Sequence, residues 1–168
     1  MTSYAEARYT PGGPTFRPLD EADRGYALFS MREGHKKSPG ADRVPWAYYK
    51  NVWGGMFEKI FDDPKTRLIG AYTVEGPLAG WLVMTPGKRV HTLHWVHVKH
   101  KRRREGLMTA LLDAAELGQR FAYTLHARRD RTTLPDGTKT KSLDESLVFA
   151  LRSRGISATF IPLQEYIK

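Results

Sequence analysis

The chain has 168 residues, a formal net charge of +9 at pH 7, 40% hydrophobic residues and 11% aromatic residues. This size and composition predict one folded domain with a real core and argue against disorder. The absence of cysteine excludes disulfides, thiolate catalysis and cysteine-based zinc sites. No run of about 18 apolar residues is present, so we expect no membrane-spanning helix and no membrane partner.

The first 13 residues are polar, contain proline and glycine, and lack the apolar stretch of a secretory signal. We therefore expect residues 1–13 to be a flexible segment and residues 14–168 to be a single domain. A cytoplasmic location is the default expectation for such a chain.

The first half of the chain is predicted to contain one strand and two helices, over residues 15–19, 20–34 and 45–61. Asp20 is a suitable N-cap for the first helix. Pro45 suits the first position of the second helix, whose apolar residues recur at helical spacing. The Gly54–Gly55 pair is a weak point inside this second helix.

Strand patterns dominate the middle of the chain, where two Gly- and Pro-containing turns separate three short apolar runs. The predicted strands cover residues 66–74, 79–84 and 89–98. The remaining predicted elements are a helix to about Gly118, a strand over 121–127, a polar loop over 130–141, a helix over 142–155 and a strand over 157–166. The order β-α-α-β-β-β-α-β-α-β predicts an α/β (α+β) fold with a central mixed sheet and helices on both faces.

The turn after the strand that ends at Val98 is strongly basic. Residues 99–104 contain five Lys or Arg and one His, and Gly106 follows before the next helix. A strand, a cationic turn and a helix N-terminus in this order form an anion site, because the free N–H groups and the helix dipole both favour negative charge. A diphosphate is the natural ligand of such a turn.

This turn and the order of elements resemble the GNAT superfamily of acyl-CoA-dependent N-acyltransferases. The family motif is a strand ending in Val, then Arg/Gln-x-x-Gly-x-Gly/Ala and a helix. Here the motif corresponds to residues 103–108, with Met108 in place of the last small residue, and Leu111–Leu112 match the Leu pair of the family. The run over residues 93–98 is most similar to small GNAT-like proteins of bacteriophages, for which the location is the host cytoplasm.

The resemblance implies acetyl-CoA or another acyl-CoA as the cofactor. Backbone N–H groups of the basic turn then hold the diphosphate, and the strand edge at Val96 and Val98 pairs with pantetheine. A thioester carbonyl that gains negative charge also needs a preorganised donor, and either of these N–H groups would serve. The residues implied for CoA binding are Val96, Val98, Arg103, Arg104, Glu105, Gly106, Leu107 and Met108.

Four histidines are spaced three residues apart, at positions 91, 94, 97 and 100. On one face of a helix they would suggest a metal site. The surrounding β-branched and aromatic residues instead predict a strand, in which His94 and His100 face one side and His91 and His97 the other. We therefore expect no metal.

His94 is the candidate general base, because alternation places it on the face of Val96 and Val98 and an imidazole is poised to take a proton near neutral pH. The alternative is a hydrogen-bonded structural histidine. His97, on the opposite face, is expected to pack beneath a helix.

The family's usual general acid is a Tyr four residues before the Gly that ends a helix. Aligned on Gly155, that position is Leu151, and the position of the family's frequent Asn is Asp144. Tyr123 and Ser146 are the candidates to replace this general acid. Alternatively, the thiolate leaves without an acid, or the protein has a different chemistry.

The first two helices and their loop correspond to the family's acceptor pocket. The candidate acceptor residues near the loop are His35, Lys36, Lys37, Trp46 and Tyr48. Interleaved basic and aromatic residues also suit nucleic acid. Because the basic turn carries more charge than a diphosphate needs, Lys101 and Arg102 are further candidates for phosphate contacts with nucleic acid.

Taken together, these patterns predict an N-acyltransferase that moves an acetyl or related acyl group from acyl-CoA to an amine by direct attack in a ternary complex. One alternative is a phage Mom-like protein that modifies DNA bases. A second alternative is a non-catalytic GNAT-fold protein that binds nucleic acid or another protein.

Overall fold

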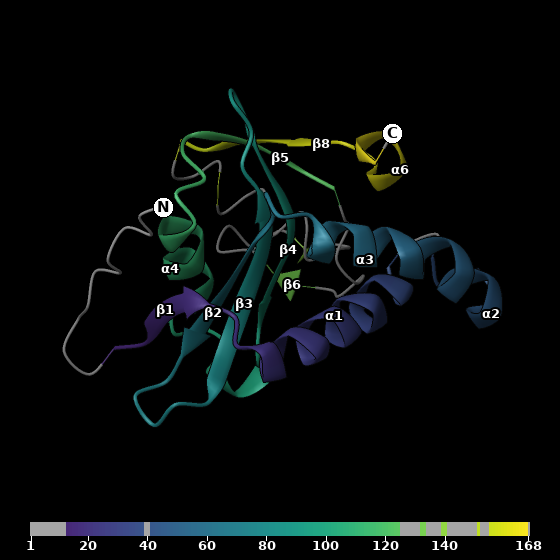
Figure 1. Ribbon diagram of the computed structural model, residues 1–168. Helices are drawn as coiled ribbons and strands as arrows, with labels where there is room; N and C mark the ends of the chain where they lie inside the picture. The colour runs from purple at the N-terminus through teal and green to yellow at the C-terminus, as the bar shows by residue number, and fades with distance from the viewer. Residues whose placement is uncertain are drawn as a thin grey trace.

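The computed structural model describes residues 13–38, 41–124, 132–133, 139–140, 151 and 155–167. These residues form a six-stranded mixed sheet with helices on both faces (Figure 1), which confirms the predicted fold class. Residues 1–12 of the predicted flexible segment lie outside the described residues.

The sheet has the strand order β1-β2-β3-β4-β5-β8. Its strands are β1 (Thr15–Pro18), β2 (Arg67–Tyr72), β3 (Leu78–Thr85), β4 (His91–Val98), β5 (Arg120–Tyr123) and β8 (Ser157–Phe160). Neighbours from β1 to β4 are antiparallel, whereas β5 is parallel to both β4 and β8. Short turns join β2 to β3 and β3 to β4, whereas the long segment 19–66 connects β1 to β2. The parallel strands require crossovers, one of which contains the basic turn.

The described helices are α1 (Glu21–Lys36), α2 (Trp46–Tyr49), the π-helix η1 (Lys50–Gly54), α3 (Gly55–Asp62), the 3-10 helix η2 (His100–Arg102), α4 (Leu107–Ala114) and α6 (Leu163–Tyr166). The second predicted helix is thus continuous but contains a wide π turn that ends at the Gly54–Gly55 pair, the weak point in its sequence. None of the described helices has the length and apolar character that crossing a bilayer requires.

Three predicted elements differ from the structure. The strand predicted over 157–166 ends at Phe160, because Pro162 has no N–H for the ladder and instead precedes α6. The predicted loop 130–141 contains a two-stranded hairpin of β6 (Thr132–Thr133) and β7 (Lys139–Thr140), whose polar strands carry no apolar alternation. Helix α4 ends at Ala114, before two positive-φ residues, Glu116 and Gly118.

Two other predicted elements fall mostly on residues that are not described. Of the predicted helix 142–155, the described residues are Leu151, which is helical, and Gly155. Of the predicted strand 121–127, residues 125–127 lie outside the described part of the chain.

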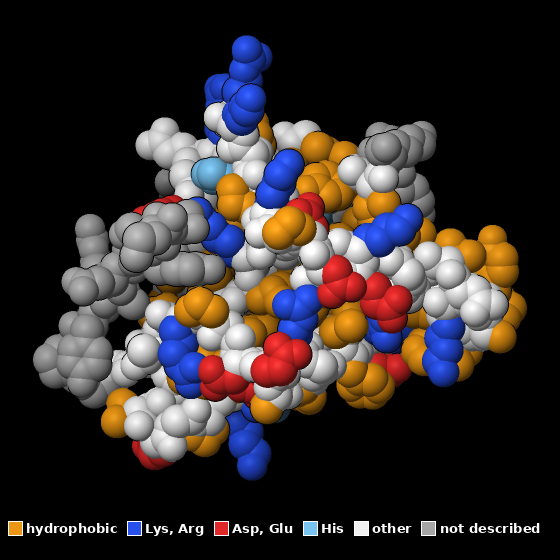
Figure 2. Space-filling view, viewed as in Figure 1, with side chains coloured by type: hydrophobic (Ala, Val, Ile, Leu, Met, Phe, Trp, Pro, Cys, Tyr) orange, Lys and Arg blue, Asp and Glu red, His pale blue; other side chains and the backbone are white. Residues whose placement is uncertain are grey.

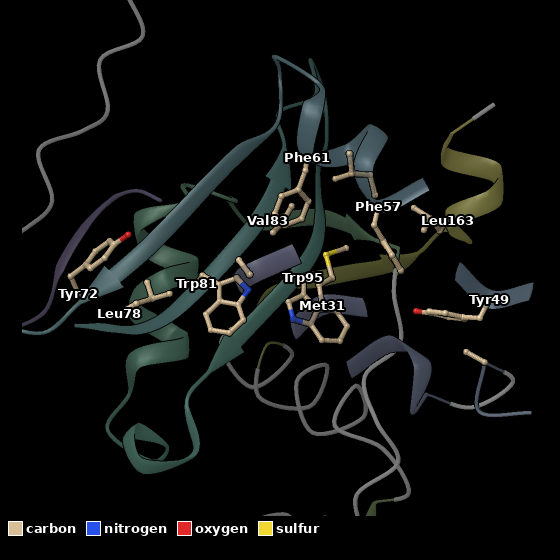
Figure 3. Close-up of a cluster of buried hydrophobic side chains, with 13 residues drawn as sticks. Met31, Tyr49, Phe57, Phe61, Tyr72, Leu78, Trp81, Val83, Trp95 and Leu163 are labelled. Carbon is tan, nitrogen blue, oxygen red and sulfur yellow. The ribbon is translucent and has the colours of Figure 1, made fainter. Parts of the chain in front are cut away.

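The core has two halves, one on each face of the sheet. Strand β3 is buried along its whole length, so its alternate side chains enter different halves. Trp81 and Val83 join the half under α1 and α3, which Figure 3 shows, and Leu82 and Met84 join the half under α4. Strands β3 and β4 contribute side chains to both halves and therefore lie at the centre of the core.

Helix α1 lies directly against the buried ring of Trp95 at Gly34. A Cβ placed on Gly34 would be 2.6 Å from Cζ2 of Trp95, closer than side chains tolerate, whereas a Cβ on Gly25 of the same helix would meet nothing within 4 Å. Gly34 therefore sets the distance between α1 and β4.

We predict opposite effects of the same substitution at these two glycines. Gly25→Ala should raise the free energy of unfolding by up to about 1 kcal/mol through helix propensity. Gly34→Ala should lower it by about 1–3 kcal/mol, because overpacking against Trp95 outweighs that gain. Urea unfolding of both variants measures the effect, and a stabilised Gly34→Ala variant would contradict the packing described above.

Candidate active site

Strands β4 and β5 separate partway along β4. Strand β4 pairs with β3 up to Val98, but with β5 only over His91 to Leu93. The last link is the hydrogen bond from the Thr124 N–H to the Leu93 carbonyl, at 3.2 Å. Beyond this link, no strand in the described part of the chain pairs with that edge of β4. The edge from His94 to Val98 is therefore open.

A β-bulge lies where the two strands separate. Val83 of β3 is opposite Trp95, but the next residue, Met84, is opposite Leu93, so His94 is an extra residue in β4. A bulge bends its strand and increases the local twist. We attribute the divergence of β4 from β5 to this extra residue.

The open edge presents backbone donors at Val96 and Val98. The N–H of Lys99 donates to Ala79 of β3 at 2.9 Å. Since N–H groups alternate between the two edges of a strand, those of Val96 and Val98 point away from β3. The Val98 carbonyl lies on the same edge and accepts a hydrogen bond from Nε of Arg103 at 3.3 Å. The resemblance implied a binding role for these valines, and the structure places both on the open edge.

The basic turn adjoins the end of this edge. Arg104 in this turn and Gly106, which follows it, have positive φ angles of 72° and 74°. Helix α4 begins next, and its first intrahelical bond runs from the Ala110 N–H to the Gly106 carbonyl at 3.0 Å. The N–H groups before Ala110 therefore have no partner within the helix. They point out of its N-terminus and favour an anion.

The other residues of this region are either exposed and charged or packed against the core. Lys101 and Arg104 are exposed, and Arg102 forms an exposed ion pair with Glu105 at 3.3 Å. Met108, which replaces the small residue of the motif, is half-buried against the core half under α4. The turn therefore keeps a surplus of positive charge.

His94 is fully enclosed at the point of divergence. It is 1% exposed, and both ring nitrogens are hydrogen bonded: Nε2 to the Thr85 hydroxyl at 3.0 Å and Nδ1 to the Thr124 hydroxyl at 2.8 Å. The Thr85 hydroxyl continues to that of Thr66 at 2.8 Å. The ring of Tyr166 meets His94 edge-on, with centroids 4.7 Å apart. A chain of hydrogen bonds thus crosses the sheet from Thr124, which follows β5, to Thr66, which precedes β2.

Two expectations for His94 are wrong. Because of the bulge, His94 does not share a face with Val96 and Val98; it bonds to Thr85, on the face of β3 that carries Trp81 and Val83. Burial lowers its pKa from 6.5 to about 4, although nearby Asp63 opposes this shift. His94 is therefore neutral near pH 7 and is not poised to hold a proton there.

His97 lies on the same face as His94. Its ring stacks on Trp81 with centroids 4.4 Å apart, and Trp81 in turn contacts Tyr26 of α1. Burial and the neighbouring Arg103 and Lys99 lower the pKa of His97 to about 4. The described residues contain no group of three His, Asp or Glu that could hold a metal ion.

Of the two candidate acids, the structure describes Tyr123. It is the last residue of β5, adjacent to Thr124 at the point of divergence, and its ring lies 5.3 Å from that of Phe160. Ser146 and Asp144 lie outside the described residues. Leu151 is buried in the core half under α4.

The candidate acceptor residues separate into two groups. His35 is buried, not at a pocket as predicted: Nδ1 lies 2.9 Å from the Tyr49 hydroxyl, and three aromatic rings surround it. Lys36 holds the loop by donating to the carbonyls of Ala41 and Asp42. The remaining candidates, Lys37, Trp46 and Tyr48, are exposed.

Sequence reasoning missed the hydroxyls that hold His94. Thr66, Thr85 and Thr124 come from separate segments, and no local pattern distinguishes them from other strand threonines. The one available signal was that Thr85 and Thr124 each follow an apolar run that ends a strand.

The overall structure is similar to those of solved acetyltransferases. An aminoglycoside 6′-N-acetyltransferase, AAC(6′)-Ih from Acinetobacter baumannii, is 16% identical over 83% of this chain and 89% of its own, with a TM-score of 0.50. An HPA2-related acetyltransferase from Corynebacterium glutamicum is 18% identical over 62% of this chain and 70% of its own, with a TM-score of 0.49. The PaiA N-acetyltransferase of Thermoplasma acidophilum, solved with coenzyme A, is 17% identical over 61% of this chain and 69% of its own, with a TM-score of 0.41.

No protein-family profile and no curated sequence matches the chain. The structural likeness establishes the fold. This chain has the fold of the GNAT acetyltransferases, as its basic turn and element order predicted.

The buried histidines predict a pH-dependent stability. An unfolded His94 takes up a proton near pH 6.5, but the folded one does so only near pH 4. The stability that neutral His94 contributes is thus present above about pH 6.5 and is lost as the pH falls towards 4. Urea unfolding between pH 7 and 4 should show that His94→Gln flattens this fall by about 3 kcal/mol.

The exposed His100 supplies the control. His100→Gln should change the pH dependence of unfolding less than His94→Gln does, because His100 is exposed. If His94→Gln and the unsubstituted protein had the same slope between pH 7 and 4, the neutral, buried state of His94 would be refuted.

Proposed function

We propose that the protein is an N-acyltransferase that moves an acetyl or related acyl group from acyl-CoA to an amine by direct attack in a ternary complex. The observation that carries the proposal is the open edge of β4 beside a basic turn, in a GNAT fold. The aminoglycoside N-acetyltransferase of the same fold supports an amine as the acceptor.

The residues present fit acyl-CoA at both ends of the open edge. The amide-containing pantetheine arm suits the N–H groups of Val96 and Val98, which β5 leaves unpaired. The diphosphate suits the turn, where Gly106 allows the positive φ and free N–H groups precede Ala110. Bound acyl-CoA supplies the activated acyl group.

The backbone of β4 stabilises the charge that acyl transfer creates. The thioester oxygen gains negative charge during attack, and a fixed N–H at Val96 or Val98 stabilises it without reorganisation. The register with β3 holds both valines in place, and Arg103 holds the carbonyl of Val98. The strand thus orients the acyl group before the amine arrives.

The proton of the attacking amine leaves through the hydrogen-bond chain at the divergence. Thr124 accepts it and gives its own proton to Nδ1 of neutral His94, while Nε2 of His94 donates to Thr85, because an imidazole can accept at one nitrogen while donating at the other. Thr85 passes a proton to Thr66, which is half-buried and releases a proton to water. This role replaces that of a base titrating near neutral pH. Tyr123, beside Thr124, is the proposed donor to the departing thiolate.

Calorimetric titration with acetyl-CoA tests the proposal. We expect binding by the unsubstituted protein and a loss of about tenfold or more in affinity for Arg103→Glu/Arg104→Glu, because the turn would repel the diphosphate. The matched control is Lys88→Glu/Arg89→Glu, which changes the net charge equally in the exposed turn at the other end of β4. The control should bind almost as well as the unsubstituted protein.

Thr124→Val separates binding from proton transfer. It should keep the affinity for acetyl-CoA but lower the release of CoA thiol with an amine acceptor found by screening. Absence of acetyl-CoA binding by the unsubstituted protein would refute the proposal and favour the non-catalytic alternative. Equal losses in both double variants would show that the turn is not the anion site.

A further inference from the structure

A second surface of the molecule combines exposed aromatic rings with cations. We name it the α2 surface and define it by Trp46, Tyr48 and Lys50. Tyr48 is 61% exposed and Trp46 is 41% exposed. Lys50 is also exposed, and its ammonium group lies 5.4 Å from the centre of the Trp46 ring. Figure 2 shows hydrophobic side chains and a Lys or Arg side by side at the end of the molecule formed by α2.

The α2 surface rests on a rigid base of stacked rings. Trp46 lies nearly parallel to buried Tyr49, at 9° and 5.4 Å, and Tyr49 stacks in turn on Trp53. His35 bonds to Tyr49, and its ring centre lies 4.6 Å from that of Trp53. Because these rings are already ordered, a ligand that stacks here loses little side-chain entropy of the protein.

Tyr48 takes no part in this internal stack. Within the described residues its ring has no aromatic or cationic partner. Tyr48 is two residues from Trp46, so the two rings project from different sides of the short helix α2. The exposed Tyr48 ring offers a free face to a flat ligand.

The charge around the α2 surface is positive. Arg43 and Lys50 are exposed, and neither pairs with a carboxylate in the described residues; Asp42 is the one acidic residue between Ala41 and Gly54. The ammonium group of Lys36 lies 5.8 Å from the centre of the Tyr49 ring. The exposed cations Arg43 and Lys50, together with the exposed rings of Trp46 and Tyr48, match a ligand that carries both negative charge and aromatic planes.

We propose that the α2 surface binds single-stranded nucleic acid, with unpaired bases stacking on Tyr48 and Trp46 and phosphates contacting Lys50 and Arg43. A second copy of the chain would bring like charges together on a protein of net charge +9. An apolar protein partner would bury Lys50 without a counter-charge. A single strand supplies both the rings and the charge.

The proposal is independent of acyl-CoA binding at the open edge of β4. No step proposed for the open edge of β4 uses Trp46, Tyr48 or Lys50. Loss of acetyl-CoA binding would leave this proposal unchanged, and failure of nucleic acid binding would leave the acyltransferase proposal unchanged.

The test measures fluorescence anisotropy of a labelled 12-nucleotide single-stranded DNA of mixed sequence, and of the same sequence as RNA, with the full chain. We expect binding that weakens with salt. Tyr48→Ala should weaken it about fivefold or more. The matched control is Phe29→Ala, because Phe29 on α1 is 60% exposed, almost as much as Tyr48. This control should leave the affinity unchanged.

A second pair of variants tests the charge. Lys50→Glu should weaken binding and reduce the slope of log affinity against log salt by about 0.7 or more. Lys59→Glu, at an exposed position on α3, should reduce both the affinity and the salt slope less than Lys50→Glu does. A duplex of the same sequence should compete at least about tenfold less well, because its bases are not free to stack.

Three results would overturn the proposal. The first is an absence of binding to either oligonucleotide at low salt. The second is equal loss in Tyr48→Ala and Phe29→Ala, or in both lysine variants, which would assign binding to general charge or to the basic turn. The third is binding to vesicles containing phosphatidylserine that needs Tyr48 while neither oligonucleotide binds, which would make the surface a lipid contact. Preference for RNA or for DNA supports the proposal in either case and identifies the natural ligand.

Discussion

Strand β4 pairs with β3 on one edge and with β5 on the other, and the pairing with β5 ends earlier. The open edge, and with it the rest of the site, depends on this early end. Strand β3 pairs with β4 from Thr92 to Val98, while β5 pairs with it only from His91 to Leu93. The extra residue, His94, bends β4 away from β5, and its side chain then bonds to Thr124, where the backbone bonds stop. The same residue thus opens the edge and ties the two strands together at the opening.

An open strand edge inside a sheet is costly unless something satisfies its polar groups. Water or a ligand must pair with the free N–H groups, because each buried donor without a partner lowers the stability of the protein by about 1–3 kcal/mol. The protein satisfies one group itself, the Val98 carbonyl, through Arg103 of the basic turn. The N–H groups that remain, together with the start of α4, favour a ligand with carbonyl oxygens along its length and a diphosphate at one end. The proposed ligand, an acyl-CoA, has both features.

The sequence was sufficient for the element order and the basic turn, because both depend on local patterns: alternation in strands, apolar spacing in helices, and a glycine after a run of cations. It was not sufficient for the face of His94, since the bulge is defined only by the register of Val83 and Met84 against β4. It also placed His35 at a pocket, because the rings that bury His35 come from segments further along the chain. Local pattern identifies elements, whereas the chemistry of a side chain depends on contacts between them.

The most direct test of the account is amide hydrogen exchange of β4, measured by NMR with and without coenzyme A. Trp95 and His97 donate towards β3 and serve as internal controls that should exchange slowly in both states. We expect the amides of Val96 and Val98 to exchange rapidly in the free protein and slowly when coenzyme A is bound. If these two amides were already protected in the free protein, or were unaffected by saturating coenzyme A, the open edge of β4 would not be the binding site.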